Sequence, residues 1–181
     1  MRWTIWTVVI VGVPTAALLL GKWIQRQQDV VRRFQAHGNF SQLRLALENY
    51  HDVYGTFPPL KLHRSQNGPE YSWRVALSEF VQKEGVFDHY DFSQPWNGTS
   101  NQKLAESLPE GMRWFHTPKI GEVDIHRTDF IGVSGPLKEW PVYGPCRTMT
   151  VSVGADSFTL IELPNSDIHW MEPRDEMNPR R

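Results

Sequence analysis

The chain has 181 residues, a formal net charge of −1 and a pI near 6.7. It has no basic patch of the kind that binds nucleic acid, so nucleic acid is not an expected partner, and it has no acidic tail for a charged partner. Its single cysteine, Cys146, excludes an intramolecular disulfide.

The N-terminus carries the most distinctive pattern of the chain. From Trp3 to Gly21 no residue is charged, and Trp6 and Trp23 lie near the ends of this run. About 20 apolar residues are needed to cross a hydrocarbon core of roughly 30 Å, and tryptophan favours the headgroup level. The pattern predicts a transmembrane helix over residues 1–24, with the lipid bilayer as a partner.

The same run fits two other interpretations. A cleaved signal peptide, with Arg2 as its basic start, requires small residues before the cleavage site. Residues 18–22 read Leu-Leu-Leu-Gly-Lys, which fits that requirement poorly. A buried core helix is the third interpretation, and an unbroken apolar run at the N-terminus argues against it.

The following segment predicts an amphipathic helix. Gly38 and Asn39 are expected to interrupt the helix that leaves the membrane, with Asn39 as the N-cap of the next one. Gly55 lies where a C-cap glycine is expected, and Pro58-Pro59 forces an extended exit. The apolar stripe follows at steps of three and four residues: Phe40, Leu43, Leu47, Tyr50 and Tyr54. We therefore divide the chain into a membrane helix (1–24), a stalk (25–59) and a globular head (60–181).

Several motifs give the chain a resemblance to a known family. Residues 39–59 (NFSQLRLALENYHDVYGTFPP), 72–77 (SWRVAL), 90–96 (YDFSQPW), 128–135 (TDFIGVSG) and 168–175 (IHWMEPRD) resemble, in the same order, segments of a bacterial pilin-like family. This family, domain of unknown function 1559, is often labelled type II secretion pseudopilin-like. The resemblance implies an α+β, pilin-like fold in which a long N-terminal helix packs on a small antiparallel sheet.

The resemblance also bears on topology and assembly. It implies an exported head with a cytoplasmic N-terminus, and other pilin-like or secretion-system subunits as partners. The flanking charges point the other way: Lys22, Arg26, Arg32 and Arg33 follow the apolar run, and the positive-inside rule would keep them in the cytoplasm. The N-terminus also lacks the prepilin Gly-Phe junction and the glutamate that pilins carry in the apolar run.

The head is expected to begin with helices and continue with strands. Spacing of apolar residues predicts helices over 72–83 and 100–108, with Ser72 as an N-cap. Residues 63–71 are polar and are expected to form a loop, and residues 86–96 an irregular aromatic segment. Short β-branched and aromatic runs predict strands at 112–115, 129–133, 148–153, 157–163 and 168–171. This order favours an α+β fold.

No arrangement of residues indicates catalysis or a bound cofactor. Each candidate group has a simpler interpretation, as a solvated loop, a half-buried thiol or a surface charge group. Adjacent helix residues, such as His51 and Asp52, do not face each other, and Ser134 lacks the spacing of a nucleophile elbow. The remaining candidates are the possible cation ligands Asp124, His126 and Asp129, the thiol of Cys146 beside Arg147, and the charged group Glu172, Arg174 and Asp175.

The sequence therefore predicts a single-pass membrane protein of the bacterial envelope with a structural or interaction role and no catalysis, metal or cofactor. An alternative is a membrane-tethered binding domain for a small ligand or envelope polymer, which would use the aromatic residues of the motifs as a groove. The simpler interpretation places those residues in the core. They are Tyr50, Tyr54, Phe57, Trp73 and Trp96. A membrane-bound hydrolase would need a nucleophile–base pair that the sequence does not contain.

Overall fold

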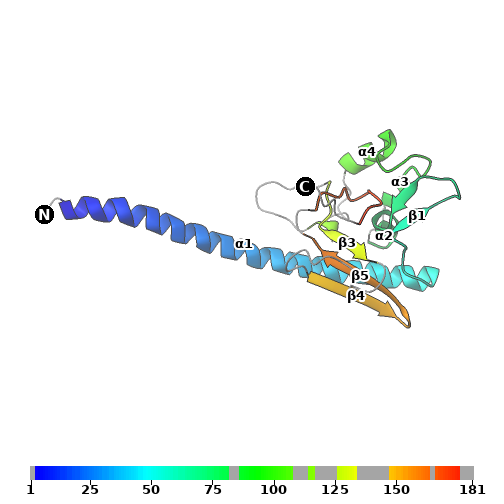
Figure 1. Ribbon diagram of the computed structural model, residues 1–181, viewed down its shortest axis with the longest axis horizontal. Helices are drawn as coiled ribbons and strands as arrows, with labels where there is room; N and C mark the ends of the chain where they lie inside the picture. Colours follow the sequence, from blue (N-terminus) through cyan, green and yellow to red (C-terminus); the bar gives the residue numbers. More distant parts are fainter. Residues whose placement is uncertain are drawn as a thin grey trace.

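The computed structural model describes residues 3–81, 86–107, 114–116, 126–133, 147–163 and 166–175; within the first helix, side chains are described from residue 17 onward, residue 32 excepted. Figure 1 shows a long helix whose C-terminal part packs on a head, while its N-terminal part projects away from it. The elements are α1 (Trp3–Tyr54), β1 (Lys61–His63), β2 (Glu70–Ser72), α2 (Trp73–Val81), α3 (Val86–His89), α4 (Thr99–Glu106), β3 (Phe130–Val133), β4 (Arg147–Val153) and β5 (Asp156–Glu162).

The expected break in the first helix does not occur. Helix α1 runs without interruption from Trp3 to Tyr54, so Gly38 and Asn39 lie inside it. Asn39 does not cap a helix; its buried side-chain amide donates instead to the backbone carbonyl of His116. A tertiary hydrogen bond has taken over the side chain that local sequence would assign to a cap.

One face of α1 is buried in the hydrophobic core of the head. Leu43 and Leu47 are completely buried, and Phe40 and Tyr50 are nearly so, as the apolar stripe predicts. Full burial of a leucine side chain contributes roughly 1.5–3 kcal/mol, so this face holds the helix on the head. Tyr54 was expected to continue the stripe, but it is half exposed because the helix ends there. Its ring leans on Tyr50, with 4.5 Å between the ring centroids.

The end of α1 follows the sequence prediction. Gly55 adopts a φ of 73°, which favours glycine, and its N–H donates to the His51 carbonyl at 2.7 Å. The chain then continues without regular secondary structure through Phe57, which is buried. The glycine therefore ends the helix and turns Phe57 back into the core.

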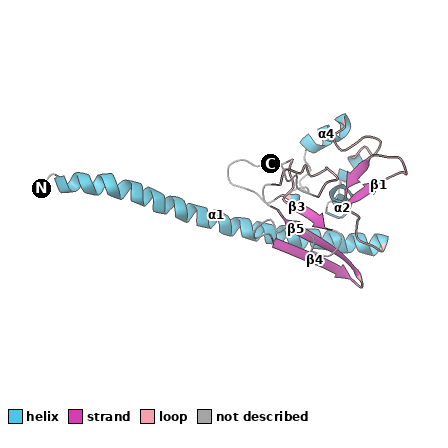
Figure 2. Cartoon of the chain, in the orientation of Figure 1, coloured by secondary structure: helices cyan, strands magenta, loops and turns pink. Residues whose placement is uncertain are grey.

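Two antiparallel sheets complete the head. The larger has the strand order β3-β5-β4, so β5 is central, and the smaller pairs β1 with β2. Strands β4 and β5 form a hairpin in which Val153 is opposite Asp156 and Gly154 has a φ of 61°. The picture coloured by secondary structure shows the three strands lying along the C-terminal half of α1 (Figure 2).

The core lies between α1, α2 and the larger sheet. Phe40 of α1 meets Phe130 of β3 edge to face, with ring centroids 5.0 Å apart. Trp73 of α2 packs against Phe115 and Phe158 at 5.7 and 5.1 Å. Edge-to-face pairs, such as Phe40–Phe130 and Trp73–Phe115, contribute beyond their buried area. The predicted α+β architecture, with a long N-terminal helix on a small antiparallel sheet, is thus confirmed.

The helices predicted in the head are present, and Ser72 acts as an N-cap. Helix α2 begins at Trp73, and the Arg74 N–H donates to the Ser72 hydroxyl at 3.2 Å. The second predicted helix corresponds to α4, with Ala105 buried and Leu104 half-buried.

Other predictions for the head were wrong. The expected loop 63–71 contains parts of β1 and β2, and the expected irregular segment contains α3. Residues 168–171 do not form a strand and contribute only a single bridge between Arg127 and His169. Of the expected strand 112–115, residues 114 and 115 form a helical turn and the rest lies outside the described residues. Strands of three residues are too short to show the alternation on which a sequence prediction depends.

In the part of the chain that the structure describes, no helix is both long enough and apolar enough to cross a membrane. The predicted span covers residues 1–24, and residues 1 and 2, together with the side chains of residues 3–16, lie outside that part.

Candidate functional site

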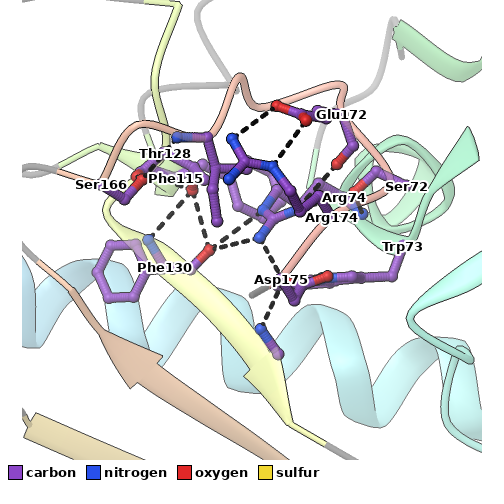
Figure 3. Close-up of polar contacts among 12 residues, drawn as sticks. Ser72, Trp73, Arg74, Phe115, Thr128, Phe130, Ser166, Glu172, Arg174 and Asp175 are labelled. Atoms are coloured by element: carbon purple, nitrogen blue, oxygen red, sulfur yellow. Dashed lines mark hydrogen bonds and ion pairs between the residues drawn. The ribbon is translucent and has the colours of Figure 1, made fainter. Parts of the chain in front are cut away.

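A buried ion pair joins two distant segments of the head. Arg74 of α2 and Asp175 near the C-terminus form a salt bridge, and their side chains are 0% and 2% exposed (Figure 3). Burial lowers the pKa of the Arg74 guanidinium, and the adjacent carboxylate opposes this shift. Both groups meet the condition under which a buried charge is tolerated, because each has a partner of opposite charge and further hydrogen bonds.

The same pair closes one edge of the sheet. The Phe130 carbonyl accepts hydrogen bonds from Arg74 Nε and Nη2 at 3.1 and 2.9 Å, and the Gly132 N–H donates to Asp175 Oδ1 at 2.8 Å. The indole of Trp73 also donates to the Asp175 carboxylate, at 3.0 and 3.1 Å. The outward-pointing backbone groups of β3 therefore find side-chain partners. We call Trp73, Arg74 and Asp175 the C-terminal latch.

The charged group predicted at the surface is divided between two environments. Asp175 is buried in the latch, which corrects the prediction that it belongs to a surface group with Glu172 and Arg174. Arg174 lies partly exposed and pairs with Glu172 at 2.7 Å and with Asp167 at 3.3 Å. Sequence reasoning missed the latch, although Arg74 was a signal: it is the one charge in the apolar start of α2.

A second polar group fixes the end of α1 to the β4–β5 hairpin. Asp156 accepts hydrogen bonds from the Phe57 N–H at 3.1 Å and from the Thr56 hydroxyl at 3.0 Å. These bonds lower the pKa of the Asp156 carboxyl, with the Phe57 N–H as the largest cause. His51 Nε2 lies 3.9 Å from this carboxylate, so the His51 side chain faces Asp156. It does not pair with its neighbour Asp52, because adjacent residues of a helix do not face each other.

A third polar contact lies where α1 leaves the head. Glu162 of β5 is buried, and it pairs with Arg147 of β4 at 3.2 Å. Arg147 also donates to the backbone carbonyl of Arg33 on α1 at 3.2 Å. The strand β4 therefore begins beside residue 33, and its hairpin ends beside residue 57.

The segment around Trp96 is held by a hydrogen-bonded loop. Asp91 accepts from Ser93 and from Gln94, and Asn101 of α4 donates to the carbonyls of Asp91 and Pro95. The hydrogen bonds of Ser93 lower the pKa of Asp91. The side chains of Asp91, Ser93 and Gln94 therefore hold this segment in place, whereas the buried Tyr90 hydroxyl has no hydrogen-bond partner among the described residues.

Most of the motif aromatics are core residues. Tyr50, Phe57 and Trp73 are buried, Tyr54 is half exposed, and Trp96 is half-buried against His169, with ring centroids 4.9 Å apart. Burial also raises the pKa of Tyr50 to about 12. The residues that carry the resemblance thus hold the head together.

The candidate reactive residues are not brought together in the described part of the chain. Asp129 is buried, and His126 stacks on His169 with 5.9 Å between ring centroids. Among the described residues no group of three metal-ligating side chains is found. Asp124, Ser134 and Cys146 lie outside the described residues.

The other notable surface is on α1, before it reaches the head. Its exposed apolar side chains include Leu18, Trp23 and Phe34, which are 66%, 58% and 75% exposed. Four of them recur at steps of three, four and seven residues and so share one side of the helix. We call these four the outer face of α1: Leu20, Ile24, Val31 and Phe34.

These features define an α+β protein with a long projecting helix and a head held by buried polar contacts. A family model described as "Protein of unknown function (DUF1559)" matches residues 25–136, more than half of the chain. The protein belongs to this bacterial pilin-like family. The match includes the α1 stripe, α2 and β3, whereas Asp175 lies beyond it. Comparison with curated proteins and with solved structures found no match.

Proposed function

We propose that the protein is a single-pass, membrane-anchored, pilin- or pseudopilin-like component of the bacterial envelope, with a structural or interaction role and no catalysis. The observation that carries this proposal is the division of α1. Its C-terminal part forms the core of the head, while residues 17–34 project away with apolar side chains exposed (Figure 1). A soluble monomer gains nothing from such a surface, and exposed apolar patches mark sites of interaction.

The first part of α1 supports membrane anchoring. The uncharged run from Trp3 to Gly21 leads directly into the exposed residues. At about 1.5 Å per residue, the helix from Trp3 to Trp23 extends roughly 30 Å, the thickness of a hydrocarbon core. The order of elements in the family supports an exported head with a cytoplasmic N-terminus, although the basic flank at Lys22 and Arg26 favours the opposite orientation.

The outer face of α1 extends beyond what a bilayer would cover. Val31 and Phe34 lie about 12 and 16 Å past Trp23 along the helix. The headgroup layer is only about 5–8 Å thick on each side. If Trp23 lies at the membrane surface, lipid does not reach Phe34, so we propose that another protein subunit covers it.

Cysteine cross-linking in membranes tests this proposal. A Phe34→Cys variant in a Cys146→Ser background should form a cross-link to a neighbouring subunit. The matched control is Arg33→Cys, because Arg33 is exposed at nearly the same height as Phe34 but lies on a different side of the helix. Equal cross-linking at both positions, or none at Phe34, would contradict a specific interface. Extraction of the protein from membranes by alkaline carbonate would contradict the anchor.

The alternative of a membrane-tethered binding domain has less support. It needs the motif aromatics to line a groove, yet Tyr50, Phe57 and Trp73 are in the core. Catalysis also has little support. Where polar side chains of the described residues come together, they form ion pairs and hydrogen bonds that hold segments of the head together.

A further inference from the structure

The two edges of the larger sheet differ in how their backbone groups are satisfied. At the β3 edge, the Phe130 carbonyl and the Gly132 N–H are bound by Arg74 and Asp175 of the C-terminal latch (Figure 3). At the other edge lies β4, and in the described part of the chain no further strand pairs with it. Figure 1 shows β4 at the outer margin of the sheet.

The alternation of hydrogen bonds identifies the open groups of β4. Because Gly132 points its N–H away from β5, its partner Leu160 points its own backbone groups toward β4. Met149 is opposite Leu160 and therefore bonds to β5. The neighbours of Met149 along β4 point the other way. The N–H and C=O groups at the outer edge belong to Thr148, Thr150 and Ser152.

The edge lacks the usual protection against pairing. Natural proteins shorten exposed edge strands or place lysine, proline or a bulge in them. Strand β4 is seven residues long, RTMTVSV, with neither lysine nor proline. Its one charge, Arg147, is turned toward Glu162 and the Arg33 carbonyl. The side chains of Thr148, Thr150 and Ser152 are exposed and uncharged.

We propose that the outer edge of β4 binds an extended segment of another protein, which adds to the sheet as an antiparallel fourth strand. Main-chain hydrogen bonds would provide affinity, as in other cases of strand addition. The segment should alternate, with apolar side chains beside Met149 and Val151 on the α1 side and hydroxyl or other uncharged polar side chains beside Thr150.

Symmetric pairing of this edge with the same edge of a second copy conflicts with anchoring in one membrane. Strand β4 runs in the same direction as α1, because it begins beside Arg33 and its hairpin ends beside Phe57. Antiparallel pairing of two β4 strands would therefore point the two α1 helices in opposite directions, whereas copies anchored in one membrane point the same way. Parallel head-to-tail pairing would require the β3 edge, which the latch closes. This choice of partner rests on the proposed membrane anchoring.

A peptide with the sequence of β5 extended by one residue, residues 156–163, is a suitable probe. Its backbone groups at Ser157, Thr159 and Ile161, which β5 turns toward β3, would match the open groups of β4. The full chain in detergent is exposed to about 1 mM peptide, and amide hydrogen exchange is followed residue by residue. The proposal expects exchange at Thr148, Thr150 and Ser152 to slow by about tenfold or more, while Met149 and Val151 change little.

A pair of variants makes the test specific. Thr150→Pro removes an outward N–H and leaves the ladder to β5 intact, so it should fold and lose the peptide-induced protection. Thr150→Val keeps the N–H and should retain it. Absence of protection by the peptide, or equal protection in both variants, would overturn the proposal.

Exchange of the chain alone separates the remaining outcomes. Protection of Thr150 that rises with protein concentration would mean that a second copy occupies the edge. Protection that is independent of concentration would mean that the chain covers its own edge. Either result overturns the proposal. A second copy at the edge would also contradict the proposed anchoring, in which all copies point in the same direction. The cross-linking at Phe34 tests the proposed function independently.

Discussion

The Asp175 carboxylate accepts a hydrogen bond from the Gly132 N–H at 2.8 Å, although the two residues are 43 positions apart. Through this contact a C-terminal segment takes the place of a strand beside β3. Arg74 lies against the same carboxylate and binds the Phe130 carbonyl, so one ion pair joins α2, β3 and the C-terminal segment.

Removal of one partner of the latch should be strongly destabilising. Asp175→Leu leaves the Arg74 guanidinium buried without its counter-charge, which costs roughly 3–5 kcal/mol of unfolding free energy. Urea unfolding measures the loss. The double variant Arg74→Met/Asp175→Leu should recover part of it, because neither charge then remains buried. As a control, Arg174→Met should cost less than about 1 kcal/mol, since its ion pairs are partly exposed. Similar costs for Asp175→Leu and Arg174→Met would contradict the assignment.

The packing of α1 on the head predicts a contrast between two leucines. Leu47 is completely buried, and Leu47→Asp should cost at least about 3 kcal/mol and unfold the head, because it buries an unpaired charge. Leu45 is 52% exposed on the same helix, and Leu45→Asp should change the stability by about 0.5 kcal/mol or less. Circular dichroism melting curves compare the two. An unaltered melting curve for Leu47→Asp would show that the α1 stripe does not form the core.

Two glycines should respond in opposite directions to alanine. A Cβ at Gly132 would lie 2.7 Å from both Leu60 Cδ2 and Phe158 Cζ, so Gly132→Ala should destabilise by roughly 1–3 kcal/mol. A Cβ at Gly38 would meet no atom within 4 Å, and alanine favours the helix, so Gly38→Ala should stabilise by roughly 0.5–1 kcal/mol. Chemical denaturation of both variants checks the signs. Equal effects would mean that Leu60 and Phe158 do not approach Gly132 closely.

The hydrogen bonds to Asp156 predict a dependence of stability on pH. They lower its pKa below the ordinary value of 3.8, so their contribution is present above about pH 4 and is lost as the pH falls through the lower pKa of the folded state. The side chain is 42% exposed, which limits the contribution to about 1 kcal/mol or less. Asp156→Asn should be less stable than the unmodified protein at pH 6, and the difference should shrink toward pH 3. A difference in stability that stays constant from pH 6 to pH 3 would show that ionisation of Asp156 does not cause the pH dependence.

The sequence was informative where a local rule and the tertiary structure agree. The stripe at Leu43 and Leu47 has the helical period of a buried face, and Gly55 has the conformation that ends a helix. Asn39 was misleading because a contact with His116, 77 residues away, decides its role. No local rule foresees such a contact.

The C-terminal latch could not be predicted from the sequence for the same reason: it depends on a contact between residues that are distant in the chain. Arg74 and Asp175 lie 101 positions apart, and although Arg74 stands out in the apolar start of α2, the sequence does not show which carboxylate it pairs with. Their pairing depends on how β3 and the C-terminal segment pack, which neither periodicity nor spacing records. The short strands β1 and β2 were missed for a related reason, since they exist only because they pair with each other.

The topology of the full chain in a bacterial host tests the account most directly. Alkaline phosphatase is fused after Arg181, and its activity is measured together with the fractionation of the fusion. We expect an active fusion that stays with the membrane after alkaline carbonate, because the proposed function places α1 in the membrane as an anchor and the head outside the cytoplasm. A stably expressed but inactive fusion would place the head in the cytoplasm, and an active fusion in the soluble fraction would remove the anchor. Either result would contradict a membrane-anchored, pilin-like envelope protein.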